Sequence, residues 1–544
     1  MRTPAPYSAP RAGLTRRDVL KAGLAAGAAI SAEPLLARAP VQAQGKRGGI
    51  LRVRGYDPPH FDPHLTLNFK TNNTLSFVYG KLVRHKVGAG VTPGTFTVEP
   101  DLAERWEEPD DTTVVFHLKK GVRWQNRLTA EDVKFTYDRF LTEKGNPQRF
   151  MLDPVDRIDV VDRYTVRFRL KEPFVWLVNV LANPICTWIV ARECVEKFGD
   201  LKRPEAAIGT GPFILERYEP NVKATFRRNT DYFRSPLPWV DGVEWLVMED
   251  ESVQLAAYTT GQIDPGGWHF WIVREHDLAT LKKSRPGLNY QDVLFNVTGG
   301  IYMRTDKPPF NDVRVRRAIS HAADRQAIID AVYVKGEPTP AIARGVPEWS
   351  PRIDQLGPGA KYYRHDPKEA RRLLAEAGFP NGLKTVLHCT SGYGSDAVDS
   401  YQMLQRQLKD GGIDAELKLQ EYGAYMATTF NGKYEGMAVG PFSITWEPHS
   451  NLYGMYMPEQ GRNSSHVSDP KIISMLREQM RTRDMEARRK IIFDIQRYAA
   501  EQQYYVYLNS IGATASWPSY LKNYAPNLSF DYGNRAAALW LEKS

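Results

Sequence analysis

Residues 384–442 contain the stretch that decides the fold class. It reads KTVLHCTSGYGSD (384–396) and then SYQMLQRQLKDGGIDAELKLQEYGAYMATTFNGKYEGMAVGPF (400–442). The pattern predicts a strand that runs into a glycine-rich turn, followed by a helix, a strand, a short helix and a strand. Because β-α-β connections place parallel strands in one sheet, this order predicts an α/β lobe with a mostly parallel sheet.

Shorter elements alternate along the first third of the chain. Residues 50–53 form an almost continuously apolar strand, which is typical of a strand buried on both faces. Pro100 is expected to open a short helix, and a further strand is expected at 114–118. Thr129, with Asp132 three residues later, is expected to cap a helix. These alternating elements predict an additional lobe of mixed α and β structure.

Length and composition indicate a large globular protein. At 544 residues the chain exceeds the size of a single core, so two or three lobes are expected. Hydrophobic residues make up 42% and charged residues 25%, as in ordinary globular proteins. The net charge is +9, but residues 1–43 hold six basic and two acidic side chains, which leaves only +5 for the remainder. Basic pairs such as Arg371-Arg372 are interpreted as solvated helix faces, so nucleic-acid binding is not expected.

The N-terminal segment resembles a twin-arginine export signal. Its core is TRRDVLK (15–21), in which Arg16 and Arg17 precede a weakly apolar run at 22–32. That run is shorter than the roughly twenty residues that a membrane-spanning helix needs. Cleavage is expected near Ala43, which would leave a mature protein that is soluble in the periplasm.

The cysteines and one glycine motif exclude two kinds of site. The three cysteines, Cys186, Cys194 and Cys389, form no CxxC pair, so a structural zinc site is not expected. A Cys186–Cys194 bridge and buried free thiols both stay open. Residues 209–211 read Gly-Thr-Gly, but a strand rather than a helix follows, which argues against nucleotide binding.

Eight segments, in this order, resemble the peptide and nickel class of ABC-transporter solute-binding proteins, called solute-binding protein family 5. They are GGILRVRGYDPPHFDP, VEPDLAERWEEPDDTTVVFHLKKGVRW, LTAEDVKFTYDR, IGTGPF, NTDYFRSPLPWVDGVEW, PFNDVRVRRAISHAADRQAI, DPKEARRLLAEAGFP and LKDGGIDAELKLQE. The resemblance covers nearly the whole chain after the signal.

The resemblance implies a periplasmic-binding-protein-like clamshell of two α/β lobes (type II, cluster C) with an additional α+β domain. The implied boundaries are 44–90, 205–295 and 510–544 for lobe I, 91–204 for the additional domain and 296–509 for lobe II. A solute would lie between the lobes, and the crossings near 295 and 509 would act as hinges. The implied partners are a membrane permease and its ATPase. A monomer without a cofactor is expected.

Candidate ligand-binding residues follow from this resemblance. Dipeptide-binding relatives hold the ligand's amine with an aspartate in one loop and its carboxylate with an arginine in another. The resemblance places the first loop at 441–458, where Glu447-Pro448 stands in the position of the family's Asp-Pro and Ile444 in that of the amine-binding aspartate. It places the second loop at 390–396, which has no arginine. Recognition by this standard pair is therefore not expected.

Aromatic and polar side chains remain as candidates for ligand contact. Aromatic walls supply contact area, and a few polar groups set orientation. For His449 the alternative is a solvated loop histidine, and for the tryptophans it is core packing. The candidates are Trp446, Glu447, His449, Trp268, His269, Trp271, Tyr393, Tyr56 and Trp349.

Three other functions are alternatives to solute capture for import: nickel binding, enzymatic activity and sensing. The scattered histidines give little support to direct nickel coordination. An exported enzyme would need a catalytic motif, and GxSxG, HExxH and GxxxxGK[ST] are all absent from the sequence. A sensory receptor on the same clamshell stays open.

Overall fold

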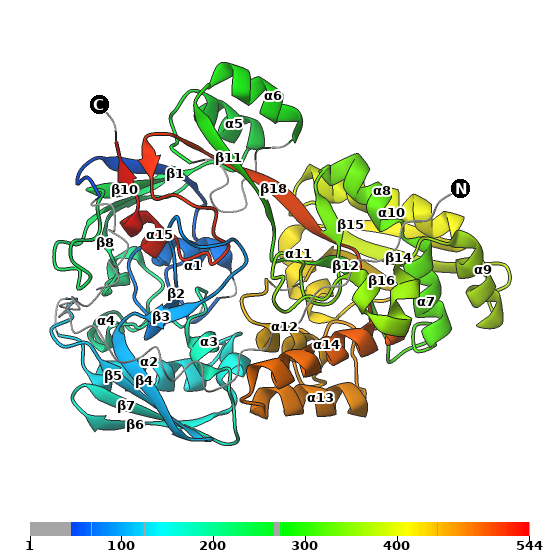
Figure 1. Cartoon of the computed structure of the whole chain (residues 1–544), viewed down its shortest axis with the longest axis horizontal. Helices are drawn as coiled ribbons and strands as arrows, with labels where there is room; N and C mark the ends of the chain where they lie inside the picture. Colours follow the sequence, from blue (N-terminus) through cyan, green and yellow to red (C-terminus); the bar gives the residue numbers. More distant parts are fainter. Residues whose placement is uncertain are drawn as a thin grey trace, which may run out of the picture. The chain divides into compact units, whose positions relative to one another are not determined.

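Four sheets of three or more strands organise the described chain, and each draws its strands from a different part of the sequence (Figure 1). The computed structural model describes residues 45–542 except Leu67, Gln125, Asn126, Cys186, 266–272, Arg274 and Ser443. The predicted export signal and the candidates Trp268, His269 and Trp271 lie outside the described residues. No helix of the described part has the length and apolar character needed to cross a membrane.

The first sheet has the order β1-β10-β9-β8, and its strands lie in the segments predicted for lobe I. β1 pairs parallel with β10, and Leu51 and Val53 of β1 are fully buried, as their apolar run predicts. The elements of this region are β1 (Ile50–Gly55), α1 (Phe69–Leu75), β8 (Phe213–Glu219), β9 (Lys223–Arg228), β10 (Gly242–Val247), α5 (Glu251–Thr259), α6 (Glu275–Ser284), β19 (Leu521–Lys522), α15 (Tyr532–Ala538) and β20 (Trp540–Leu541).

The second sheet, β4-β5-β7-β6, is antiparallel and carries α2. The predicted cap of α2 is confirmed, because the Thr129 backbone N–H donates to Asp132 Oδ2 at 2.8 Å. The elements of this region are β2 (Val83–His85), β3 (Val98–Pro100), β4 (Ala103–Asp110), β5 (Thr113–Leu118), α2 (Ala130–Thr142), η1 (Arg149–Leu152), β6 (Val155–Asp162), β7 (Thr165–Leu170), α3 (Leu177–Leu181), α4 (Arg192–Phe198) and η2 (Pro204–Ala206).

The prediction of a helix that opens at Pro100 is wrong. Pro100 ends β3, and the residues from Ala103 onward form β4, which pairs antiparallel with β5. The polar side chains of β4 are mostly exposed, so the local sequence gives little sign of a strand. Pairing with β5 supplies the backbone hydrogen bonds and overrides the helix-opening preference of proline.

The third sheet has the order β15-β14-β16-β12-β17. β14 pairs parallel with β15 and β16, as the β-α-β order predicts, but β12 pairs antiparallel with both β16 and β17. The expectation of a mostly parallel sheet therefore holds only for the three strands joined by helical connections. β12 and β17 adjoin the two chain crossings instead, so no β-α-β unit sets their direction.

Helices α7, α9 and α10 place apolar side chains in the core that covers this sheet. The elements of the region are β12 (Gly299–Met303), α7 (Val313–Ala322), α8 (Arg325–Ile328), η3 (Ile329–Tyr333), η4 (Ile353–Gln355), η5 (Gly357–Tyr363), α9 (Pro367–Glu376), β14 (Leu383–Thr390), α10 (Ser395–Asp410), β15 (Ile413–Gln420), α11 (Tyr422–Ala427), η6 (Thr429–Asn431), β16 (Met437–Pro441), α12 (Pro448–Tyr456), α13 (Pro470–Arg481), α14 (Met485–Gln502) and β17 (Tyr505–Tyr507).

The fourth sheet, called here the crossing sheet, joins the first and third sheet regions. β18 (Asn509–Pro518) pairs antiparallel with β11 (Leu288–Leu294) through residues 512–518. The same strand pairs with β13 (Gly336–Pro338) through residues 509–511. Figure 1 shows β11 and β18 side by side where the chain passes between the two regions.

A buried ion pair ties the C-terminal helix to the start of the second sheet region. Lys81 Nζ lies 2.7 Å from Asp531 Oδ2, and both side chains are almost completely buried. The Lys81 ammonium also lies 3.9 Å from the ring centre of Trp188. Asp531 caps α15 by accepting from the Asn534 backbone N–H.

Replacing Asp531 with alanine should lower the free energy of unfolding by about 3 to 5 kcal/mol, because it leaves the Lys81 charge buried without its partner. Chemical denaturation measures this loss. The double variant Lys81→Met, Asp531→Asn should lose clearly less than Asp531→Ala, since it removes both charges. Equal losses in the two variants would contradict a dominant role for the stranded charge.

Candidate ligand-binding site

The loop that follows β16, named here the Trp446 loop (residues 442–447), is anchored to the segment before β12. Phe442 N donates to Thr298 O at 2.7 Å, and Thr445 N donates to Asn296 O at 2.8 Å. Asn296 Nδ2 donates in return to Thr445 O at 2.7 Å. These bonds hold the backbone of the loop at its start and its middle, so the side chains that follow have defined positions.

Trp446 reaches from this loop to the C-terminal segment of the chain. Its Nε1 donates to Leu528 O at 3.0 Å, and its ring packs edge-on against Phe530 with ring centres 5.7 Å apart. Only 6% of the residue is exposed. The indole therefore connects a segment predicted for lobe II with one predicted for lobe I.

Glu447 caps the N-terminus of α12 from a buried position. Both carboxylate oxygens accept from the Ser450 backbone N–H at 3.0 Å. Within the described part of the chain, Glu447 forms no ion pair. Burial raises the pKa of this carboxyl, although the hydrogen bonds from Ser450 act in the opposite direction. A buried carboxylate without a cation can accept an ammonium or hydroxyl group from a solute.

Trp446 and Glu447 line one small cavity. The cavity has a volume of about 30 Å³, which is room for a water molecule or two rather than for an organic solute. Its lining combines apolar walls with amide, hydroxyl and charged groups. The lining residues are Phe69, Met151, Asn183, Ile185, Ile444, Trp446, Glu447, Ser450, Asn451 and Arg462.

Arg462 is the charged residue among the cavity-lining residues that sequence reasoning missed. It lies in the turn between α12 and α13, and its guanidinium forms no hydrogen bond or ion pair with any described residue. Desolvation lowers its pKa to about 10. No local motif distinguishes Arg462 from the other arginines of the chain, so only the folded turn reveals that it lines the same cavity as Glu447.

His449 and Trp349 lie in a packed interface and do not line this cavity. Gln479 Nε2 donates to His449 Nδ1 at 2.8 Å, and Trp176 Nε1 donates to Gln479 Oε1 at 2.7 Å. The ring of Trp349 lies 5.4 Å from that of Trp176, and the His449 ring lies 4.9 Å from Phe174. His449 and Trp349 are each 6% exposed, so the interpretation of His449 as a solvated loop residue is wrong.

Tyr393 and Tyr56 belong to a second aromatic group. Tyr393 lies in the turn before α10, and its ring meets that of Tyr422 edge-on with centres 5.5 Å apart. Burial raises the pKa of Tyr422, and the nearby Tyr56 phenol raises it further. Tyr56 also carries the Arg54 guanidinium 3.5 Å from its ring centre. The fold thus brings together aromatic residues from the segments predicted for lobe I and lobe II.

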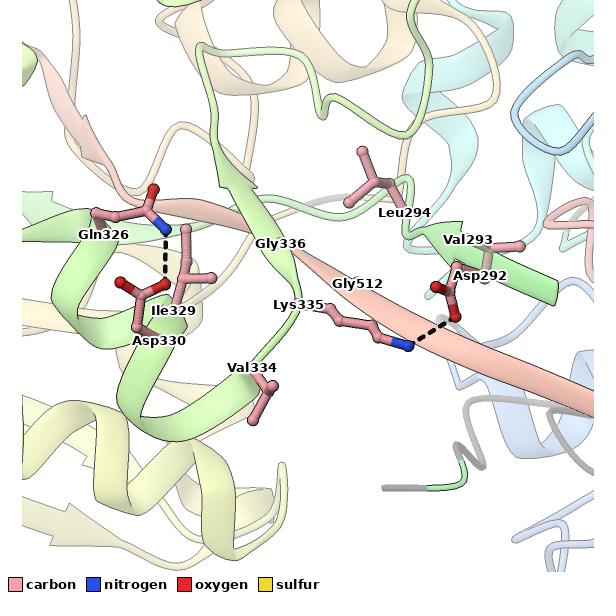
Figure 2. Close-up of a pocket in the computed structure, with 10 residues that line it drawn as sticks. All are labelled: Asp292, Val293, Leu294, Gln326, Ile329, Asp330, Val334, Lys335, Gly336 and Gly512. Atoms are coloured by element: carbon pink, nitrogen blue, oxygen red, sulfur yellow. Dashed lines mark hydrogen bonds and ion pairs between the residues drawn. The ribbon is translucent and has the colours of Figure 1, made fainter. Parts of the chain in front are cut away.

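A larger and more open hollow lies beside the crossing sheet (Figure 2). Its volume is about 340 Å³, and it contains none of the predicted site residues. Lys335 Nζ lies 2.8 Å from Asp292 Oδ1 and 2.9 Å from Glu275 Oε2. Because its charged groups already pair with one another, this hollow offers a solute less than the small cavity does.

Metal-ligating residues do not gather in the described chain. Among the described residues, no group of three or more His, Cys, Asp and Glu side chains is placed to hold a metal ion. Cys194 and Cys389 are buried free thiols, and Cys186 lies outside the described residues.

The two-lobed architecture is that of the periplasmic solute-binding proteins. Residues 97–463 match the model of the bacterial extracellular solute-binding proteins, family 5 (middle region), which is more than half of the chain. The chain therefore belongs to family 5 of the bacterial extracellular solute-binding proteins. It is the periplasmic solute-binding component of an ABC importer, and its family consists of transport proteins rather than enzymes.

Curated relatives and solved structures agree with this assignment. The chain is 28% identical over 488 residues to Di/tripeptide-binding protein 1 of Pseudomonas aeruginosa. The matched region covers 82% of this chain and 86% of that protein. It is similar to the periplasmic binding protein DppA of Helicobacter pylori in complex with the peptide STSA, at 25% identity and a TM-score of 0.76, with 92% of this chain and 99% of that chain covered. It is also similar to AgaA of A. tumefaciens R10 in complex with agropinic acid, at 26% identity and a TM-score of 0.77, with 91% and 99% covered.

Acidification from pH 7 to pH 4.5 should destabilise the protein through His449. Burial lowers the pKa of His449 to about 3, whereas an unfolded histidine has a pKa of 6.5. The unfolded chain therefore binds more protons below pH 6.5, and the stability contributed by neutral His449 is lost progressively as the pH falls from there. The expected loss is on the order of 2 kcal/mol at pH 4.5.

Melting temperatures measured across this pH range check the contribution of His449. The variant His449→Gln should show a shallower loss on acidification than the wild type. The exposed His365 offers a matched control, and His365→Gln should keep the wild-type slope. A His449→Gln variant with the wild-type slope would assign the acid sensitivity to other groups.

Proposed function

We propose that this protein leaves the cytoplasm by the twin-arginine route, is cleaved near Ala43, and carries a small organic solute to a permease and its ATPase. The solute is a peptide or a peptide-like compound, with non-peptide acids included. The protein works as a monomer. The observation that carries the proposal is the cavity that Trp446 and Glu447 line from the predicted lobe II segment. Phe69 of a predicted lobe I segment and three residues of the predicted additional domain line its other side.

The size of the cavity implies that binding requires an opening motion. A volume of about 30 Å³ excludes an organic solute, so the lining has to separate before a solute enters. The chain passes between the predicted lobes beside the crossing sheet, at 294–299 and 507–512, and a hinge acts there in the proposal. Trp446 then meets the solute as an aromatic wall after it leaves its contact with Phe530.

The printed ligands of the relatives support a solute of this kind. A di/tripeptide-binding protein, a complex with the peptide STSA and a complex with agropinic acid span peptides and an opine acid. The second aromatic group, which contains Tyr56 and Tyr393, supplies additional contact area in the proposal. The enzyme and sensory alternatives draw no support from these relatives.

Replacing Arg16 and Arg17 together with lysine should abolish accumulation of the protein in the periplasm, because the paired arginines carry the export signal. Cell fractionation with immunoblotting measures the distribution. N-terminal sequencing of the exported wild type should begin near residue 44. Unchanged export of the double-lysine variant would contradict the twin-arginine route and leave the proposal for the cavity untouched.

A solute screen by thermal shift tests the binding function, because a ligand of the folded state alone raises the melting temperature. The screen includes di- and tripeptides, agropinic acid, sugars and nickel chelates. We expect shifts with peptides or with agropinic acid. Shifts with sugars or nickel chelates alone would contradict the proposed solute class.

Glu447→Gln should weaken the binding of a solute that carries an ammonium group by about tenfold, which corresponds to a lost charge-assisted hydrogen bond of about 1.5 kcal/mol. Wild-type affinity should also fall on acidification, since the raised pKa of Glu447 favours its neutral form. Isothermal titration calorimetry measures both effects. Glu421 caps α11 from an exposed position, so Glu421→Gln is the matched control with unchanged affinity. Equal affinities in the wild type, Glu447→Gln and Glu421→Gln would show that Glu447 does not bind the solute.

A further inference from the structure

The cavity beside α12 contains a cation that the fold itself does not neutralise. Arg462 lines the cavity, yet its guanidinium has no hydrogen-bond or ion-pair partner among the described residues. Desolvation lowers its pKa to about 10, so the side chain still carries its charge at neutral pH. Arg462 is partly buried. A cation that is partly withdrawn from water without a partner costs stability, and an anionic group on a bound molecule would supply that partner.

The surroundings of Arg462 are already engaged elsewhere. Tyr302 Oη donates to Pro441 O at 2.5 Å, and Tyr505 Oη donates to Met455 O at 2.9 Å. Both phenols lie near Arg462, but their protons point to backbone carbonyls. Neither phenol oxygen accepts a hydrogen bond from Arg462, so the guanidinium donors have no partner within the described chain.

Glu447 does not neutralise Arg462 although both line the cavity. The Glu447 carboxylate is held at the N-terminus of α12 by the Ser450 backbone N–H. The aliphatic part of Arg462 passes the same helix at Gly454, where the ideal Cβ position lies 3.7 Å from Arg462 Cδ. Seven residues of helix separate the two attachment points, a rise of about 10 Å. The cavity thus has an acidic and a basic end.

The backbone beside Arg462 is fixed before any solute arrives. Asn463 is buried, and its Nδ2 donates to Met457 O at 3.2 Å and to Val467 O at 2.8 Å. Its Oδ1 accepts from Val467 N at 2.8 Å. This closed turn presents Arg462 from a rigid base, which reduces the entropy lost when the guanidinium binds.

We infer that Arg462 determines specificity by binding a carboxylate of the solute at the end of the cavity remote from the Glu447 cap. The inference rests on the proposed function and names the chemical group that the cavity selects. A planar guanidinium matches a carboxylate with two parallel hydrogen bonds. The apolar walls formed by Phe69, Met151 and Ile444 favour an organic acid over a free inorganic anion.

Matched pairs of probes test the carboxylate directly. The pairs are Ala-Phe with its C-terminal amide and 3-phenylpropionate with 3-phenylpropionamide, titrated by calorimetry into the exported, processed protein. The wild type should bind at least one acid 10- to 100-fold more tightly than its amide, the range of a charge-assisted hydrogen bond. In Arg462→Gln this ratio should fall to about threefold or less.

Two further variants separate charge from geometry. Arg462→Lys should keep part of the preference, because lysine retains the charge and lacks the planar fork. Arg477 is exposed on α13, so Arg477→Gln should keep the full wild-type ratio. An Arg462→Gln variant that prefers the acid as strongly as the wild type does would overturn the inference.

The stability of the ligand-free protein gives a readout that needs no ligand. Arg462→Gln should melt at or above the wild-type temperature, because it removes a partly buried charge that has no hydrogen-bond or ion-pair partner among the described residues. A lower melting temperature would show a structural role and overturn the inference. If no probe binds the wild type, the proposed solute class fails, and the stability comparison still decides the status of Arg462. Binding of 3-phenylpropionate but not of Ala-Phe, dependent on Arg462, would support the inference and reject peptides as the solute.

Discussion

The arrangement of the whole molecule depends on the double pairing of β18. One half of this strand completes a ladder with β11, and the other half pairs with β13. A continuous extended strand is stiff along its length. The β11 and β13 ladders therefore change their relative orientation only if the backbone of β18 bends near residues 511–512. Gly512 lies at this point, where an ideal Cβ would approach Lys335 Cβ to 2.7 Å. The crossing therefore confines relative motion of the regions it joins to a short segment.

Contacts far from the crossing restrict that motion further. The apolar core that contains the second sheet continues into the helices that follow the third sheet, through Trp176 and Trp349. Arg483 pairs with Glu108 of β4 and with Asp111 of the turn that follows it. The segment predicted as the additional domain is thus joined to the segment predicted for lobe II by burial as well as by charge. This leaves the Trp446 contact to Phe530 as the connection between the lobe segments at the cavity.

The cavity combines features that would oppose stability if no solute entered it. Among the described residues, the buried Glu447 has no cationic partner and the partly buried Arg462 has no anionic partner. Burial raises the pKa of the Glu447 carboxyl and lowers that of the Arg462 guanidinium, and both shifts favour the neutral form. Shifts of this kind are typical of ligand-binding sites, where a bound molecule supplies the opposite charge. The interface around His449 shows the opposite pattern, because Gln479 satisfies the ring nitrogen and Trp176 satisfies Gln479. This contrast separates a binding cavity from a packed interface made of the same residue types.

Sequence alone determined the α/β class, the family and the local elements whose signals are short-range. The cap at Thr129, the buried strand at 50–55 and the β-α-β unit that ends at β16 all depend on neighbours within a few residues. It also named Trp446 and Glu447, which line the cavity. Tertiary structure alone decided that β4 is a strand, that β12 runs antiparallel, and that Trp349 and His449 pack in an interface. It alone placed Arg462 in the cavity that Glu447 also lines. Desolvation and pairing depend on atoms brought together from distant parts of the chain, and a one-dimensional pattern does not contain those distances.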